Sequence, residues 1–218
     1  MNYQSNTIRD RVRRATPGDV PEIARIHRQA FVDSFLARMG ASFLCAYYRS
    51  VLEHDGGIML VHEAPAGIDG FVSGFVRPES FYTLLKRSKW ALAKPLAAAF
   101  IRHPSLLGRI FYNVRRVAIR SPRTIPEGCE LSSIAVDPSA QKSGVGKLLV
   151  NAFIDQAWRD GAASVYLTTD ASENAAVNRF YQRLGFELRE RFEQYRGRIL
   201  NEYILFRNTR IQAPGKTA

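Results

Sequence analysis

The sequence predicts an α/β fold in which helices cover the faces of a mixed β-sheet. Three observations support this fold class. Strand-like segments gather toward both ends of the chain, helical segments with one apolar face separate them, and the centre follows the order strand, helix, strand, helix. The chain has 218 residues, of which 46% are hydrophobic, and can bury one sizeable core. We therefore expect a single domain over 1–218, with a flexible tail over 208–218.

The first half of the chain predicts a strand, two helices and a β-hairpin. Asp19 follows a turn and stands where a helix N-cap is expected. Phe43, Tyr47 and Val51 recur every four residues, which is typical of one helix face. Pro65-Ala66-Gly67 is a turn-forming sequence between two strand-like segments. The expected elements are a strand over 12–16, helices over 20–31 and 42–52, and hairpin strands over 58–63 and 68–77.

The second half predicts alternating strands and helices that end in two more strands. A long segment, 78–127, precedes it, and a structureless loop of that length is unusual in a compact domain. We therefore expect a helical insertion between the third and fourth strands, with helices over 90–101 and 106–117. The remaining elements are strands over 130–136 and 164–169, helices over 145–159 and 174–184, and strands over 186–195 and 199–206.

Within the insertion, the stretch 81–126 carries nearly all of the net charge of +11. The stretch 81–126 contains no Asp or Glu, and it could pack on its own domain with a solvated charged face. Two further interpretations are a lid for an anionic acceptor and peripheral contact of 83–120 with an anionic membrane surface or another polyanion. Its basic residues are Lys86, Arg87, Lys89, Lys94, Arg102, Arg109, Arg115, Arg116, Arg120 and Arg123.

The loop 141–146, Gln-Lys-Ser-Gly-Val-Gly, has the features of an anion cradle. It joins an apolar strand to a helix, and its glycines let backbone N–H groups approach a phosphate closely. The helix N-terminus adds partial positive charge, and Lys142 and Lys147 add full charges. The loop lacks the Walker A order, and Leu149 replaces the last glycine of a dinucleotide-binding fingerprint. Taken alone, the pattern fits a structural turn as well as a pyrophosphate site.

Two motifs in the correct order resemble the GCN5-related N-acetyltransferase (GNAT) family. The first is Gln-x-x-Gly-x-Gly over 141–146, and the second is Asn-Ala-Ala-Val-Asn-Arg-Phe-Tyr over 174–181 with Gly185-Phe186 after it. The opening Arg-Arg-Ala-Thr-x-x-Asp over 13–19 also fits. The resemblance covers about 8–76 and 127–206, and leaves the insertion out.

The resemblance implies that acetyl-CoA is the cosubstrate, and it implies which residues hold it. Backbone groups of Ile134, Ala135 and Val136 would pair with the pantetheine arm. The loop would hold the pyrophosphate, Asn174 would lie near the cofactor where two strands separate, and Asn178 and Tyr181 would face the same site. The implied loop residues are Gln141, Lys142, Ser143, Gly144, Val145, Gly146 and Lys147.

Acetyl transfer to an amine needs a proton acceptor for the amine and a proton donor for the departing thiolate. Glu130 stands eleven residues before Gln141, where a subset of the family carries a glutamate base. The plain alternative is that Glu130 is a surface charge at a strand end. Tyr181 would protonate the thiolate, or would be only a core tyrosine, and a backbone N–H near Ile134 would stabilise the oxyanion. Cys129 adjoins Glu130, but an acyl-cysteine route lacks a neighbouring histidine.

The acceptor is the least determined part of the prediction. We expect the primary amine of a small molecule, such as an amino sugar or a phosphate-bearing metabolite. The alternatives are a protein N-terminus or lysine, and a non-catalytic module that binds CoA or a polyanion. Nucleic acid is not expected, because no basic strand carries the aromatic residues that stack bases. The sequence allows a homodimer and does not determine the oligomeric state.

The remaining residues indicate a cytoplasmic protein without a metal. The cysteines, Cys45 and Cys129, lack a C-x-x-C spacing and are expected to be reduced and buried. The polar and then basic stretch 1–14 has no apolar core of the kind found in signal peptides. The histidines share no spacing typical of a metal site.

Overall fold

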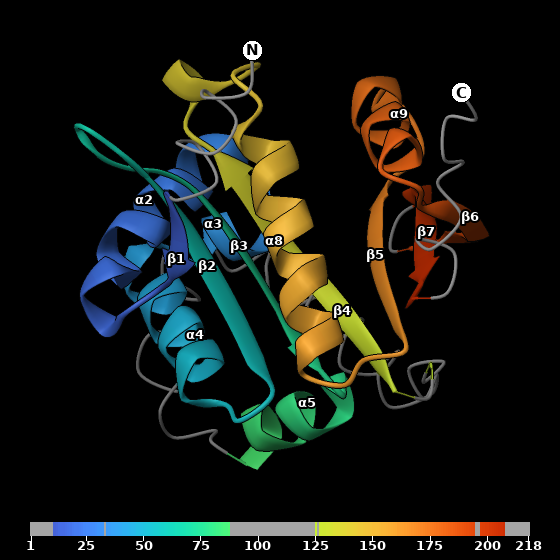
Figure 1. Ribbon diagram of the computed structural model, residues 1–218, viewed down its shortest axis with the longest axis horizontal. Helices are drawn as coiled ribbons and strands as arrows, with labels where there is room; N and C mark the ends of the chain where they lie inside the picture. Colours follow the sequence, from blue (N-terminus) through green and yellow to red (C-terminus); the bar gives the residue numbers. More distant parts are fainter. Residues whose placement is uncertain (1–10, 33, 88–124, 126, 195–196, 208–218) are drawn as a thin grey trace, which may run out of the picture.

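The computed structural model describes residues 11–32, 34–87, 125, 127–194 and 197–207. They form a seven-stranded sheet in the order β1-β2-β3-β4-β5-β7-β6, with helices on both faces (Figure 1). Among the described strand pairs, β4 and β5 run parallel and the others antiparallel. The mixed sheet confirms the predicted fold class. The strands are β1 (Val12–Arg14), β2 (Gly57–Ala64), β3 (Gly67–Val76), β4 (Gly128–Val136), β5 (Ser164–Asp170), β6 (Glu187–Glu193) and β7 (Ile199–Phe206).

The predicted helices outside the insertion are confirmed to within one residue at each end. A short helix after α2 was not expected. The helix α5 lies at the start of the insertion, ahead of the two helices that were predicted there over 90–101 and 106–117. Short 3-10 turns, η1 (Pro17–Asp19) and η2 (Pro138–Ala140), precede two of the helices. The helices are α2 (Val20–Ala30), α3 (Phe35–Arg38), α4 (Ala41–Glu53), α5 (Pro78–Arg87), α8 (Val145–Arg159) and α9 (Ala175–Arg183).

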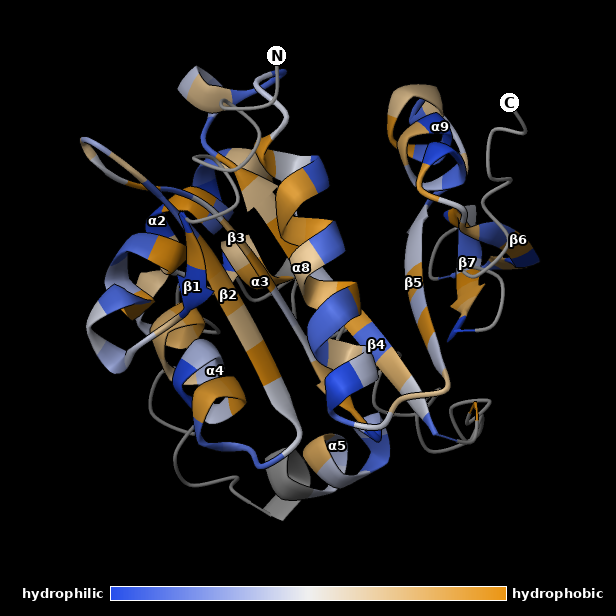
Figure 2. Ribbon diagram, in the orientation of Figure 1, coloured by the Kyte–Doolittle hydropathy of each residue, from blue (hydrophilic) through white to orange (hydrophobic). Residues whose placement is uncertain are grey.

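Two apolar cores lie on opposite faces of the sheet. Because side chains alternate along a strand, β3 contributes residues to both cores. Phe71 and Phe75 belong to the core under α2, α4 and the start of α5. Val72 and Val76 belong to the core under α8 and α9. Figure 2 shows apolar residues along β2 and β3 and on α8. Because both faces are covered, β3 is buried without interruption from Gly70 to Val76.

Asp19 is the N-cap residue of helix α2, as expected, but its side chain binds other groups. Its carboxylate accepts hydrogen bonds from the backbone N–H and the hydroxyl of Thr16, at 2.7 and 2.9 Å, and so caps the turn η1. No side-chain cap bond is formed at α2. Arg13 also binds this carboxylate, at 2.7 and 3.0 Å. The ion pair and the turn together use the oxygens that a helix cap would need.

A bulge in β4 and the separation of β4 from β5 shape the centre of the sheet. Ser73 of β3 pairs with Ser133 and Gly74 pairs with Leu131, so Ser132 is an extra residue on β4. The strand β4 pairs with β5 only over 128–130, and β5 then pairs with β7 alone. In Figure 1 the two strands meet near the bottom and separate toward the top.

Several predictions fall outside the described residues. These are the helices expected over 90–101 and 106–117, most of the basic stretch 83–120, and the tail over 208–218. In the part of the chain that the structure describes, no helix has both the length and the apolar character needed to cross a bilayer.

Candidate active site

A cleft of about 910 Å³ opens between β4 and β5 beyond the point where the two strands stop pairing. Residues 131–136 of β4 form one side and 167–170 of β5 the other. The helix α9 contributes Phe180 and Tyr181, and Arg198 lies just before β7. The separation leaves backbone groups on one edge of β4 without a neighbouring strand, so an extended ligand can pair with that edge.

The structure brings about half of the predicted site residues to this cleft. Glu130 and Asn178 do not line it. Most of the loop residues also lie outside the lining: 141–144 are exposed before α8, Lys147 is exposed in its first turn, and Val145 is buried in the core beneath it. The predicted residues that line the cleft are Ile134, Ala135, Val136, Gly146, Asn174 and Tyr181.

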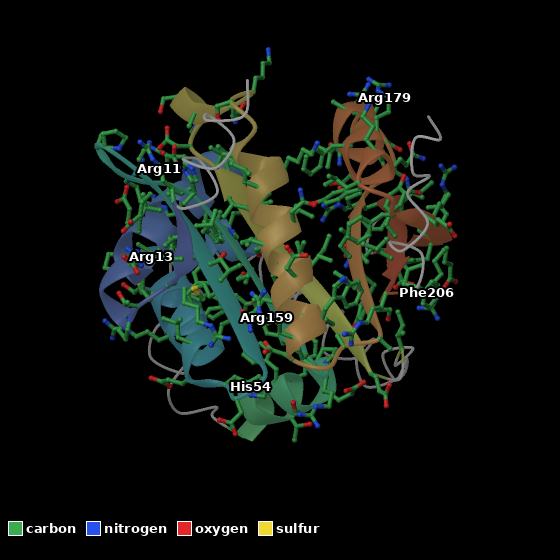
Figure 3. All side chains as sticks on the ribbon, in the orientation of Figure 1. Arg11, Arg13, His54, Arg159, Arg179 and Phe206 are labelled. Carbon is green, nitrogen blue, oxygen red and sulfur yellow. The ribbon has the colours of Figure 1, made fainter. Side chains whose placement is uncertain are left out.

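The loop before α8 is shaped by two left-handed residues. Lys142 has a φ of 65°, and Gly144, the N-cap residue of α8, has a φ of 91°. The first turn of α8 leaves backbone N–H groups without intrahelical acceptors, beside the cleft-lining Gly146. The exposed side chains of Lys142 and Lys147 add positive charge. Arg179, which the sequence did not single out, is exposed on α9 at the same end of the molecule (Figure 3).

The two predicted asparagines have different surroundings. The Asn174 amide donates to Thr169 Oγ1 at 2.7 Å, and both residues line the cleft. Asn178 is buried and uses its amide within the protein. It donates to the carbonyls of Asp170 and Asn174, and its Oδ1 accepts from Asn201 and Tyr203 at 2.8 and 2.9 Å. Its contacts therefore connect α9 to β5 and β7.

Glu130 is held by phenols from two elements. The Tyr82 hydroxyl of α5 donates to both carboxylate oxygens, at 3.0 and 3.2 Å, and Tyr166 of β5 also donates to the carboxylate. Glu130 is partly buried and does not itself line the cleft, although the next residues, Leu131 and Ser132, do. The sequence reasoning missed both tyrosines. Pairing of the two predicted neighbouring strands could have identified Tyr166, which is the parallel partner of Glu130. Tyr82 lies in the insertion, where no motif marks it.

The electrostatic setting of Glu130 favours proton exchange near neutral pH. Burial raises the pKa of its carboxyl from 4.5 to about 7. The hydrogen bonds from Tyr82 and Tyr166 oppose this rise, and the charges of Glu202 and Glu79 add to it. A carboxyl with a pKa close to 7 is matched to a general base that works at neutral pH.

Tyr181 is a buried phenol at the edge of the cleft. Its ring packs edge-on against Phe180 and Phe186, with ring centroids 5.2 and 5.7 Å away, and is tilted against Tyr203. Burial raises the pKa of its hydroxyl above the ordinary value of 10, so the group keeps its proton at neutral pH. The hydroxyl is thus in the form that a proton donor requires.

Glu130 and Tyr181 approach the cleft from opposite faces of the sheet. Tyr181 belongs to the core under α8, whereas Tyr82, the partner of Glu130, packs against the core under α2 and α4. Cys129 faces the α8 core, and burial raises the pKa of its thiol, which disfavours the nucleophilic thiolate. Over the described residues, no group of three or more His, Cys, Asp or Glu side chains could hold a metal ion.

Comparison with known proteins agrees with this architecture. The model of the acetyltransferase (GNAT) family matches residues 22–186, a span that includes β4, the loop before α8, and α9. The match covers well over half of the chain. The chain therefore belongs to the GNAT acetyltransferase family, a family of acyltransferases, as the motifs at 141–146 and 174–186 predicted.

Individual relatives are more distant. The [ribosomal protein bS18]-alanine N-acetyltransferase of Escherichia coli K12 is 35% identical over 74 residues, which are 34% of this chain and 49% of that protein. The chain thus spans about half the length of the curated relatives it matches.

Two solved structures share the fold. A ribosomal-protein-alanine N-acetyltransferase from Brucella melitensis is 17% identical, with a TM-score of 0.60 over 89% of this chain and 98% of its own. The protein yncA of Salmonella typhimurium, solved with its cofactor acetyl-CoA, is 21% identical, with a TM-score of 0.60 over 89% and 92%. At these identities the likeness concerns the fold.

Proposed function

We propose that the protein transfers the acetyl group of acetyl-CoA directly to a primary amine, without a covalent enzyme intermediate. The observation that carries the proposal is the cleft between β4 and β5, which has Tyr181 on its wall and Glu130 next to it. A proton acceptor with a pKa of about 7 and a protonated phenol are the two groups that the reaction needs.

In the proposed complex, acetyl-CoA lies along β4. Backbone groups of 134–136 pair with the pantetheine arm, and the loop 141–147 holds the pyrophosphate. Gly146 supports this arrangement because a Cβ at this position would meet Phe180 and Val136 only at 3.8 Å. Packing within the protein therefore does not require a glycine here, whereas close approach of a phosphate to the backbone does.

Proton transfers accompany the exchange of the acetyl group. The amine nitrogen attacks the thioester carbonyl, and Glu130 takes the amine proton, directly or through one water next to Ser132. A backbone N–H near Ile134 stabilises the oxyanion. The C–S bond then breaks, and Tyr181 gives its proton to the thiolate. Because burial raises the pKa of Tyr181, we expect this transfer to be concerted with C–S cleavage.

The proposed acceptor is a small molecule with a primary amine, either an amino sugar or a phosphate-bearing amine. The basic residues of 81–126 support an anionic acceptor. The second candidate is a protein N-terminus, and the match to a ribosomal-protein alanine N-acetyltransferase favours it, although that match covers a third of the chain. A lysine side chain is a variant of the second candidate.

The test is a thiol-release assay with acetyl-CoA and a panel of amines. The panel holds amino sugars, aminoalkyl phosphates, polyamines, peptides with an N-terminal alanine, and lysine peptides with a blocked N-terminus. We expect turnover with one class, confirmed by the mass of the acetylated product. Acetyl-CoA binding by calorimetry without turnover would favour a non-catalytic CoA-binding module, and failure to bind acetyl-CoA would overturn the proposal.

A further inference from the structure

The start of the insertion is tied firmly to the sheet. Phe81 of α5 stacks on Phe75 of β3, with ring centroids 4.0 Å apart. The Ser80 hydroxyl lies 3.1 Å from Nε2 of His54, which Figure 3 labels at this end of the molecule. The backbone N–H of Arg77 donates to the carbonyl of Gly128 at 3.1 Å. These contacts fix the first turns of α5 next to the beginning of β4.

Tyr82 follows directly on this anchored turn and contacts the carboxylate of Glu130. Its ring packs edge-on against Phe75 and Phe81, with centroids 5.9 and 5.8 Å away, and its hydroxyl reaches both Glu130 oxygens. Burial raises the pKa of Tyr82 well above 10, so the hydroxyl stays a donor over the working pH range. A donor shared between both oxygens restrains rotation of the carboxylate.

We propose that Tyr82 is a positioning residue for Glu130, so that the first helix of the insertion is a working part of the acetyl-transfer site. The inference rests on the proposed role of Glu130 as the base. It assigns a function to a segment outside the two family motifs at 141–146 and 174–186: α5 orients the base and sets the pH at which the base gains its proton.

The helix α5 also carries a residue that shifts the pKa of Glu130 in the direction opposite to Tyr82. Glu79, three residues before Tyr82, raises the pKa of Glu130 by its charge, whereas the Tyr82 hydrogen bond lowers it. Oε1 of Glu79 is buried and has no hydrogen-bond partner among the described residues. Glu202 is paired with Arg189 at 3.0 Å. Among the described residues, the titratable groups that interact with Glu130 are Tyr82 and Glu79 of α5, Tyr166 of β5, Glu202 of β7, Tyr47 of α4 and the neighbouring Cys129.

Two substitutions in α5 should therefore move the pH response in opposite directions. Tyr82→Phe keeps the ring but removes the hydrogen bond to a charged acceptor, and should raise the midpoint of the acidic limb of kcat/KM by about one pH unit. Glu79→Gln removes a neighbouring negative charge and should lower the midpoint by roughly half a unit. Tyr47→Phe is the matched control, because its hydroxyl bonds Ser132 at 3.1 Å and not Glu130.

A measurement without substrate separates this inference from the proposed function. Carboxyl resonances of ¹³C-labelled glutamate are followed by NMR against pH, and the signal of Glu130 is assigned by its loss in Glu130→Gln. Opposite shifts in Tyr82→Phe and Glu79→Gln, with the midpoint of Tyr47→Phe unchanged, support the inference even if no acceptor is found. Shifts of equal sign, or an unmoved midpoint in a folded Tyr82→Phe, would overturn it.

Discussion

Replacing Glu130 by glutamine should remove the proposed proton acceptor and yet stabilise the fold at alkaline pH. Burial raises the pKa of this carboxyl from 4.5 to about 7, so the folded protein binds the carboxyl proton more tightly than the unfolded chain does. Below pH 4.5 the carboxyl is protonated in both the folded and the unfolded state, so its ionisation does not lower the free energy of unfolding. As pH rises toward and above 7, ionisation favours the unfolded chain, and the free energy of unfolding falls by about 3 kcal/mol from this group.

Glutamine has no charge to desolvate and keeps the shape of the side chain. Glu130→Gln should therefore match the wild type near pH 4.5 and exceed it at pH 8 by about 3 kcal/mol, or about 6 to 12 °C in Tm for a chain of this size. Urea unfolding at pH 4.5, 6, 7 and 8 measures the difference. Exposed Glu187→Gln is the control and should track the wild type throughout. A gain that does not change with pH would refute a raised pKa for Glu130.

Three further substitutions test the rest of the site. Tyr181→Phe keeps the ring contacts and should lower kcat about 100-fold, with the acetyl-CoA Kd from calorimetry unchanged; an unchanged kcat would remove Tyr181 from the mechanism. Gly146→Val should place methyl groups in the cleft and weaken acetyl-CoA binding about tenfold or more, while the Tm changes little; unchanged affinity would contradict the proposed binding mode. Asn178→Ala should lower the free energy of unfolding by about 2 to 3 kcal/mol in urea, because the partners of its amide lose their bonds; loss of acetyl-CoA affinity without loss of stability would instead indicate a direct role.

The order of elements was predictable because each segment carries its own periodicity. Strands and helices outside the insertion end within two residues of the expected positions, and the helix over 145–159 is reproduced in full. The short helix α3 was missed because four residues show too little of a helical period to be recognised. The N-cap position of Asp19 was predicted correctly, but the use of its carboxylate by Arg13 was not, because that ion pair depends on tertiary structure.

The site was only half predictable, and the reason is geometrical. Local motifs mark the loop 141–146 and the helix 174–184, where chemistry depends on residues close in sequence. The two hydrogen-bond partners of Glu130, Tyr166 and Tyr82, are 36 and 48 residues away in sequence. Tyr82 lies in the insertion, for which no motif exists. The bulge at Ser132 is equally invisible in the sequence, because it arises from pairing with Ser73 and Gly74.

The burial of Glu130 explains why the insertion begins with a helix that packs so closely. Glu130 pairs with Phe75 on one side and Tyr166 on the other, so its side chain must leave the sheet on the α2 and α4 face. Without α5 over that face, the carboxyl would meet water and its pKa would lie nearer 4.5, where it is a weak acceptor for an amine proton. With α5 in place, burial raises the pKa, and Tyr82 supplies the donor that keeps the buried carboxylate from being left unpaired. A stability cost of about 3 kcal/mol at pH 8 then follows directly from the raised pKa that suits Glu130 to the proposed role of base.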